Sequence, residues 1–362
     1  MSLFNHASTT RRKFGKGAVL ALALAVAGAG SAFAAAQVNL LETGSSLLYP
    51  LFNLWVPAFT KAHPNVRITT QSTGSGTGMS QAVAGIAQIG GSDAYLSNFI
   101  MHQHSDMLNI PLAISSQMVN YNVPGLNRDH LKLSGPVLAG IYSGKITKWN
   151  DAEIAKINPG VKLPDHQIVT IHRTDGSGDT FIFTQYLSAS TPSWANSIAY
   201  GTTISWPAIE GGLGAVGNPG MLTALKGTAY SIAYIGISYE KTILESGMGI
   251  AALGNHDGRF VLPTPRTVSD AAAAMVAKTP SDERVSLIFA PGAESYPIIN
   301  YEYAIVKKNQ PNSETAEALR TLFTWAISKN GGNAPRYMEA VHFAALPASV
   351  AKLSQEQINQ IR

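Results

Sequence analysis

The stretch from His172 to Phe183 reads HRTDGSGDTFIF and places an arginine, two aspartates, two glycines and a serine directly before an apolar run. The β-branched segment 168–171 before it predicts a strand, and the segment 180–187 predicts a helix. A helix that begins after a Gly/Ser loop offers unpaired backbone N–H groups and the positive end of its dipole. Such a loop can hold a small oxyanion, and Arg173 would add a planar cationic fork.

The order of strand, Gly/Ser loop and helix occurs twice more. The predicted strand 38–41 leads through the loop TGSS at 43–46 to a predicted helix over 47–62. The predicted strand 66–70 leads through GSGTG to a predicted helix over 79–87, and the loop IGGSD at 89–93 closes the unit. A single turn of this kind commonly only caps a helix. Three of them indicate an α/β sheet whose loops would bind an oxyanion if they converge.

Composition excludes several functional classes. The chain has 362 residues, which is enough for two domains, and 45% of them are hydrophobic, as in a globular protein. Charged residues make up 13%, the net charge is +4, and no run of Lys and Arg follows residue 16, so we expect no nucleic-acid partner. Cysteine is absent, which excludes disulfides, thiol catalysis and a lipid-modified cysteine.

The N-terminus has the layout of a secretory signal peptide. A basic segment containing Arg11 and Arg12 precedes an Ala/Leu/Val stretch, and Ala32-Phe33-Ala34 matches a small-x-small cleavage signal. We therefore assign residues 1–36 to the signal and expect a soluble periplasmic protein. The paired arginines are typical of twin-arginine (Tat) export, but an ordinary Sec signal explains them equally well, so the export route stays open.

Several catalytic patterns fail or are weak. No Walker A sequence, dinucleotide fingerprint or G-x-S-x-G elbow is present. His102 and His104 lie two residues apart, but no distant ligand pair completes a metal site, so a solvated face is the simpler interpretation. His172 and Ser177 could form a base and a nucleophile, yet no third group orients them, which favours His172 as a strand-end residue. We expect no metal, no cofactor and no enzymatic activity.

The chain closely resembles the PstS-type periplasmic phosphate-binding proteins of ABC phosphate importers over nearly all of its mature length. The likeness is closest to the mycobacterial lipoprotein branch, although this chain lacks the lipobox cysteine of that branch. The segments that carry it are 42–50 (ETGSSLLYP), 74–76 (GSG), 89–94 (IGGSDA), 173–181 (RTDGSGDTF) and 296–301 (YPIINY).

The resemblance implies a two-lobed periplasmic binding protein fold of type II, with two crossover strands as hinge. Lobe I would comprise residues 37–114 and 298–362, and lobe II residues 115–297. The crossings would lie near 113–121 and 297–305. The implied partners are inorganic phosphate and the membrane permease of an ABC phosphate importer, and we expect a monomer.

The resemblance also implies the phosphate contacts. Ser75 would donate a hydroxyl, Asp93 would accept the phosphate proton, and Arg173 would bind the anion. Leu48 and Asp179 stand where the enterobacterial pattern has threonine, so Leu48 would serve through its backbone N–H. The full expected set, with Asp175 as the carboxylate holding Arg173, is Ser46, Leu48, Ser75, Asp93, Arg173, Ser177, Gly178 and Asp179.

Protonation would then separate phosphate from sulfate. Phosphate keeps a proton near neutral pH and can donate it to Asp93, whereas sulfate would leave that buried carboxylate unmatched, at a cost of about 1–3 kcal/mol or more. Three alternatives stay open at this point. They are a phosphatase or esterase that uses Ser177, a binding protein for sulfate, molybdate or a phosphonate, and a surface adhesin without a transport role.

Overall fold

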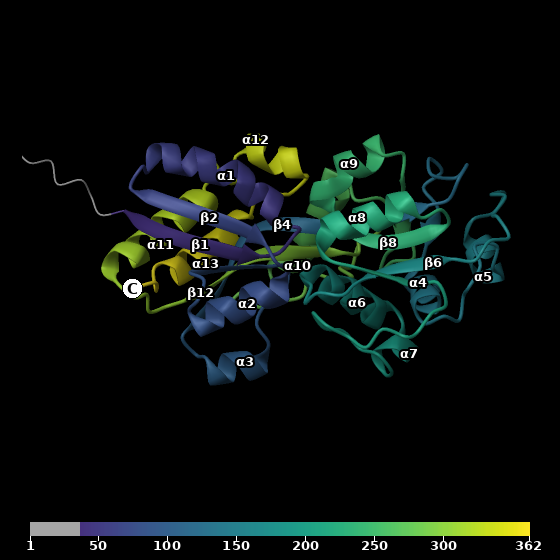
Figure 1. Ribbon diagram of the computed structural model, residues 1–362, viewed down its shortest axis with the longest axis horizontal. Coiled ribbons are helices and arrows are strands. Elements are labelled where there is room, and N and C mark those ends of the chain that lie inside the picture. The colour runs from purple at the N-terminus through teal and green to yellow at the C-terminus, as the bar shows by residue number, and fades with distance from the viewer. Residues whose placement is uncertain (1–36) are drawn as a thin grey trace, which may run out of the picture. The chain divides into compact units, whose positions relative to one another are not determined.

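The computed structural model describes residues 37–362, which form one unit, so the interpretation of residues 1–36 as a signal peptide lies outside the described residues (Figure 1). The strands in this part of the chain are β1 (Val38–Gly44), β2 (Val66–Ser72), β3 (Ile89–Ser92), β4 (Met107–Asn122), β5 (Lys132–Leu133), β6 (Val169–Arg173), β7 (Leu213–Ala215), β8 (Ser231–Gly236), β9 (Gly249–Ile250), β10 (Ala252–Gly254), β11 (Phe260–Val261) and β12 (Ile299–Lys307). The α-helices are α1 (Tyr49–Ala62), α2 (Ser75–Ala84), α3 (Asn98–Gln103), α4 (Gly135–Tyr142), α5 (Ala152–Ile157), α6 (Gly178–Ser190), α7 (Pro192–Ala195), α8 (Gly217–Gly227), α9 (Glu240–Glu245), α10 (Pro265–Val276), α11 (Ser313–Ala326), α12 (Pro335–Met338) and α13 (Ala348–Ile358). Two 3₁₀ turns, η1 (Ile237–Tyr239) and η2 (Glu339–Val341), complete the elements.

One sheet runs through the described residues in the order β2-β1-β3-β12-β4-β8-β6-β7, with β9 also paired to β4. Strand β4 is 16 residues long and buried along its whole length. Its first part, up to Ser116, pairs with β12, and its second part, from Gln117, pairs with β8. We call β1, β2 and β3 with their helices the β1 half, and β6, β7 and β8 with their helices the β8 half; β4 runs from one to the other (Figure 1).

Strand direction brings the loops of both halves to the middle of β4. Strands β1, β2 and β3 are parallel to one another, while β12 is antiparallel to both β3 and β4, so β4 runs in the direction of β3. Strand β8 is antiparallel to β4, and β6 and β7 follow β8 in parallel. The two sets of strands therefore point their carboxyl ends at each other, and Gly236 at the end of β8 pairs with Gln117. Ligand sites of open α/β sheets lie at such carboxyl ends.

Helices cover both faces of each half. Figure 1 shows α1 and α12 above the β1 half with α2 and α3 below, and α8 and α9 above the β8 half with α6 and α7 below. Helix α1 illustrates the cause, because Leu51, Phe52, Trp55 and Phe59 recur at helical spacing and are all buried. No helix among residues 37–362 is long and apolar enough to cross a membrane.

Two of the three helices predicted after the Gly/Ser loops begin earlier than expected, whereas α1 begins at Tyr49, two residues after the expected start. Helix α2 starts at Ser75, not at Met79, and α6 starts at Gly178, not at Thr180. Ser177 caps α6, since its hydroxyl accepts a hydrogen bond from the N–H of Thr180. The loops thus form the first turns of the helices, which places their N–H groups directly at the sheet edge.

Candidate functional site

Asp93 lies at the centre of the polar side chains that meet beside β4. It follows β3 directly and is 2% exposed. Its carboxylate oxygen Oδ1 accepts a hydrogen bond from the hydroxyl of Ser45, and Oδ2 accepts one from the hydroxyl of Ser75 at 3.2 Å. The loops after β1, β2 and β3 therefore converge on one carboxyl group, which is the condition that the repeated strand-loop-helix order left open.

Arg173, at the carboxyl end of β6, is held by two aspartates. Its Nε donates to Oδ1 of Asp175 at 2.7 Å and its Nη2 to Oδ2, while its Nη1 donates to Oδ2 of Asp179 at 2.6 Å. Asp175 was expected to hold Arg173, and the structure shows this ion pair. The second ion pair, with Asp179, was not anticipated, and it places Asp179 inside the cluster.

The β1 half and the β8 half touch at the glycines. The N–H of Gly76 donates to the carbonyl of Gly176 at 2.9 Å. A β-carbon on Gly178 would stand 2.3 Å from Oδ2 of Asp93 and 2.5 Å from Oγ of Ser75. Only glycine permits this approach, because real β-carbons do not come so close to other heavy atoms.

The first turn of α6, which lies beside Asp93, has free backbone donors. The N–H groups of Gly178 and Asp179 belong to the first turn of the helix, and no acceptor for either is found among residues 37–362. Together with the guanidinium of Arg173, they form a set of donors facing the acceptor Asp93. A small oxyanion that also carries a proton would satisfy both kinds of group.

Three further residues of the cluster were missed by sequence reasoning. Gln117, in the middle of β4, donates through Nε2 to Oδ1 of Asp179 at 3.0 Å. Asn218, in the first turn of α8, donates to Oδ2 of Asp179 at 2.8 Å and to Oγ of Ser46 at 3.0 Å. Glu302 of β12 lies opposite Asp93. The sequence could have indicated Asn218, because the glycine-containing stretch VGNPG at 216–220 follows β7 and opens α8.

The carboxyl groups of the cluster differ in the direction in which their pKa is shifted. Burial raises the pKa of Asp93 to about 7, and the negative charge of Asp179 adds to the effect. Burial also raises the pKa of Asp179, against the lowering influence of Arg173. Burial alone would raise the pKa of Asp175, but the hydrogen bonds and charge of Arg173 outweigh it and lower that pKa below its ordinary value. Arg173 therefore keeps Asp175 ionised, whereas burial opposes the charge of both Asp93 and Asp179.

The remaining predicted contacts lie in the same place but are bonded within the protein. The N–H of Leu48 donates to the hydroxyl of Ser45 at 3.0 Å, and the hydroxyl of Ser46 accepts from Asn218. Ser177 serves as the cap of α6. The residues expected to bind the anion are thus brought together, and their individual contacts with a ligand stay predictions.

The patterns set aside in the sequence form no site among the described residues. The ring of His172 packs on Trp206, with centroids 5.2 Å apart, and makes no hydrogen bond with Ser177. His102 lies in α3 and His104 ends it. No group of three or more His, Asp or Glu side chains within residues 37–362 is placed to hold a metal ion.

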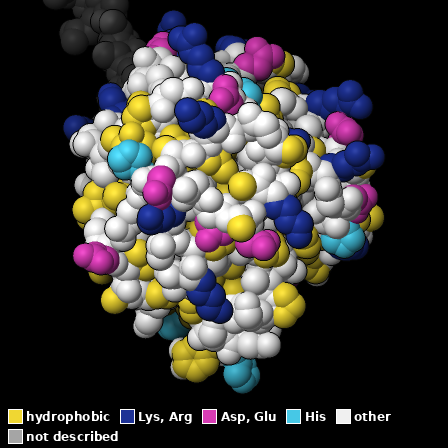
Figure 2. Space-filling model, turned by 90° about the vertical axis from the view of Figure 1, so that its right-hand side faces the viewer, with side chains coloured by type: hydrophobic (Ala, Val, Ile, Leu, Met, Phe, Trp, Pro, Cys, Tyr) yellow, Lys and Arg dark blue, Asp and Glu magenta, His cyan; other side chains and the backbone are white. Residues whose placement is uncertain are grey.

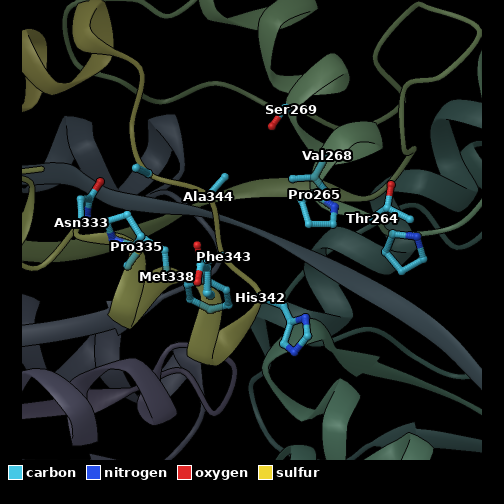
Figure 3. A pocket seen from close by; sticks show the side chains of 13 residues that line it. Thr264, Pro265, Val268, Ser269, Asn333, Pro335, Met338, His342, Phe343 and Ala344 are labelled. Carbon is cyan, nitrogen blue, oxygen red and sulfur yellow. The ribbon is translucent and has the colours of Figure 1, made fainter.

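A cavity of about 470 Å³ lies elsewhere, between the start of α10 and the segment 333–345 (Figure 3). Figure 3 shows Pro265 and Val268 on one side and Met338 and Phe343 on the other. The amide of Asn333 at its edge is already bonded to the carbonyls of Leu112 and Ala326. This apolar lining lacks the converging donors of the Asp93 cluster, so the cluster is the candidate site.

Comparison with known proteins identifies the class. A family model described as the PBP superfamily domain matches residues 28–330. A high-affinity periplasmic phosphate-binding protein bound with phosphate at pH 8.5 superposes with a TM-score of 0.71, at 21% identity over 88% of this chain and 93% of its own. A phosphate-binding protein from Stenotrophomonas maltophilia superposes with a TM-score of 0.70, at 20% identity over 88% and 93%. The expected two-lobed α/β fold of periplasmic binding proteins is confirmed.

Curated relatives narrow the class. Phosphate-binding protein PstS of Methanocaldococcus jannaschii is 33% identical over 90% of this chain and 87% of its own length. The protein of the same name from Pasteurella multocida is 33% identical over 90% and 91%. The chain therefore belongs to the PstS family of phosphate-binding proteins. These names describe binding proteins, in agreement with the expectation that the chain is not an enzyme.

The expected closeness to the mycobacterial branch is not supported. A phosphate-binding protein of Mycobacterium leprae is 30% identical over 80% of this chain, which is less than the archaeal and non-mycobacterial bacterial relatives reach. The motifs that suggested the branch are short segments, and identity over the whole chain outweighs them.

Proposed function

We propose that this protein binds inorganic phosphate outside the cytoplasm and delivers it to the membrane permease of an ABC importer. The observation that carries the proposal is the placement of Asp93, a buried acceptor fixed by Ser45 and Ser75, opposite Arg173 and the N-terminus of α6. The names of the relatives support phosphate as the ligand. Acceptor and donors together suit an anion that is itself a hydrogen-bond donor.

In this proposal each expected residue has a distinct task. Arg173 and the N–H groups of Gly178 and Asp179 donate to phosphate oxygens, and the hydroxyl of Ser75, which donates to Asp93 in this structure, turns to a phosphate oxygen when the ligand binds. Ser46, Leu48 and Ser177 shape the surrounding helix starts. Asp93 accepts the phosphate proton. Asp179, which is 1% exposed and directed at Arg173, accepts a second proton when the dihydrogen form binds. Sulfate has no proton to offer and would be rejected.

The two halves act as lobes that close on the ligand. We assign residues 37–114 and 298–362 to lobe I and residues 115–297 to lobe II, with β4 and β12 as the hinge. The hydrogen bond from Gly76 to Gly176 joins lobe I to lobe II, so opening must break it. Closure would then give the permease a surface that differs between the loaded and the empty protein.

The cellular location and the partners belong to the same proposal. A cleaved N-terminal signal, of Tat or Sec type, would export the protein as a soluble monomer to the periplasm. No nucleic-acid partner is proposed. On the face shown in Figure 2 the Lys and Arg side chains lie singly among acidic and uncharged ones, which does not form a basic stripe.

Calorimetric titration tests the proposal. The chain from Gln37 onward would be stripped of carried-over ligand and titrated with phosphate and then with sulfate at about pH 7, where phosphate keeps a proton. We expect one phosphate per chain with a dissociation constant near micromolar or below, about −8 kcal/mol or better, and no heat from sulfate. Binding of sulfate with equal affinity would refute the role of Asp93, and binding of neither anion would refute the oxyanion site.

A further inference from the structure

Glu302 occupies an irregular point of the pair formed by β4 and β12. The two strands pair in register except for a β-bulge between Glu302 and Tyr303. Bulges re-aim side chains and are frequent next to functional sites. The side chain of Glu302 is fully buried. Because Tyr303 pairs with Ser92 in the antiparallel β12–β3 ladder, Glu302 lies opposite Asp93, the residue that follows β3.

The surroundings of Glu302 do not suit a charged carboxylate. Its Oε1 accepts hydrogen bonds from the hydroxyl of Ser115 and from Nδ2 of Asn300. Its Oε2 has no donor partner among the described residues. The nearby cation, Arg173, directs its Nε, Nη1 and Nη2 at the two other aspartates. An ionised Glu302 would therefore be a buried charge without a counterion, which is strongly unfavourable.

The number of charges in the cluster also argues against an ionised Glu302. The cluster holds four carboxyl groups, those of Asp93, Asp175, Asp179 and Glu302, and its guanidinium, that of Arg173, is paired with Asp175 and Asp179. Two carboxyl groups in contact at low dielectric cannot both be ionised, so one proton is held between Glu302 and Asp93. Where that proton resides decides what Asp93 can do, because a carboxylate only accepts hydrogen bonds and a carboxylic acid also donates one.

We propose that Glu302 holds this proton: it is a neutral carboxylic acid that donates through Oε2 to Asp93 and so keeps Asp93 an ionised acceptor for the proton of bound phosphate. Burial of Glu302 and the negative charge of Asp93 both raise the pKa of Glu302 well above its ordinary value. Asp93 has room for the bond, since a carboxylate offers about four lone-pair sites and Ser45 and Ser75 use two. Glu302 is a positioning residue, and its role in selecting phosphate rests on the proposed function.

Carbon-13 NMR with labelled glutamate carboxyl groups tests the protonation state directly. The signal of Glu302 is assigned by its loss in Glu302→Gln and followed at about pH 7, with and without phosphate, against the ordinary glutamate pKa of about 4.3. We expect the chemical shift of a carboxylic acid in both states. A carboxylate shift would overturn the proposal. This result does not depend on ligand binding, so it stays decisive even if the protein binds no phosphate, which would refute the proposed function separately.

Binding to matched variants tests the positioning role. Glu302→Leu removes the donor to Asp93 and is expected to weaken phosphate binding by roughly tenfold or more, the effect of an unmatched buried polar group. Glu302→Gln keeps an N–H donor of similar shape and should recover most of that loss. The control is Glu283→Gln, another fully buried glutamate, which bonds to Ser354 and Gln357 and should bind as wild type. Equal affinity of the Leu variant and the wild type would overturn the positioning role, and unfolding curves establish that each variant is folded.

Discussion

Replacing Gly178 by alanine should weaken phosphate binding without weakening the fold. A β-carbon at this position would stand 2.3 Å from Oδ2 of Asp93, 2.5 Å from Oγ of Ser75 and 2.6 Å from the β-carbon of Asp93. Ordinary contacts of a β-carbon begin at about 3.4 Å, so the helix start would have to retreat by about 1 Å. The carboxylate of Asp93 cannot easily turn aside, because the hydroxyls of Ser45 and Ser75 each hold one of its oxygens.

The magnitude follows from the cost of overpacking, which is typically about 1–3 kcal/mol for an added methyl group in a well-packed place. Since about 1.4 kcal/mol corresponds to a factor of ten, the dissociation constant for phosphate should rise by roughly 5- to 150-fold. The strain exists only where α6 meets Asp93. In the proposed open form it disappears, so the free energy of unfolding without ligand should stay the same or rise slightly, as expected for alanine in place of glycine in a helix.

Isothermal titration calorimetry with phosphate and urea unfolding without phosphate measure the two quantities. The matched control is Gly220→Ala in α8, where the added β-carbon would meet only ordinary contacts, the nearest at 3.6 Å. It should bind phosphate as wild type does. If Gly178→Ala binds as tightly as wild type, the proposed closure does not bring α6 against Asp93. If it instead loses stability without ligand, the strain is not specific to closure.

Three further predictions rest on the same contacts. Arg173→Ala strands Asp175 and Asp179, at a cost on the order of 3–5 kcal/mol of stability, and calorimetry on the folded variant should show no phosphate binding; normal binding would remove Arg173 from the site. Asp179→Thr should weaken phosphate binding more at about pH 5 than at about pH 8, because phosphate is mainly in its dihydrogen form at the lower pH. A variant with wild-type affinity across that range would refute the acceptor role of Asp179. Burial raises the pKa of Glu42 from 4.5 to about 8, so the folded protein holds a proton that the unfolded chain has lost, and stability should fall as pH rises between these values. Glu42→Gln should remove most of that decline in the free energy of unfolding, on the order of several kcal/mol over the range at about 1.4 kcal/mol per pH unit. Urea unfolding at the two ends of the pH range measures it, and a decline as large in the variant as in the wild type would show that Glu42 is not the cause.

The local elements of the site could be predicted from the sequence because each depends on a short stretch. The β-branched segment 168–171, the Gly/Ser loop after it and the apolar run from Thr180 give strand β6, the cap at Ser177 and helix α6. The start of α6 was placed two residues late, since Gly178 and Asp179 are poor helix formers and here form the first turn. Helix propensity alone does not reveal that unpaired N–H groups at this helix start are available to an anion.

Convergence of the loops could not be predicted from spacing, since it depends on the order and direction of strands. The β1 half and the β8 half meet only because β4 pairs with β12 along one part and with β8 along the other. The resemblance to a known family supplied that arrangement. Gln117 and Glu302 were missed because each lies inside a long buried strand, where no local motif marks a polar residue as functional. Buried polar residues on such a strand are the signal that should be examined.

In the proposed function, the balance of charge in the cluster would decide which anion it holds. Arg173 is already paired with Asp175 and Asp179 before a ligand binds, so its charge does not by itself attract a second anion. Attraction must come from oriented N–H groups at the helix starts, which complement any oxyanion alike. Discrimination must therefore come from the acceptors, and these accept only from a ligand that carries a proton. A site with more carboxyl groups than cations is unfavourable for sulfate and favourable for phosphate, provided that Asp93 keeps its charge, and the protonated Glu302 behind it is what would allow this.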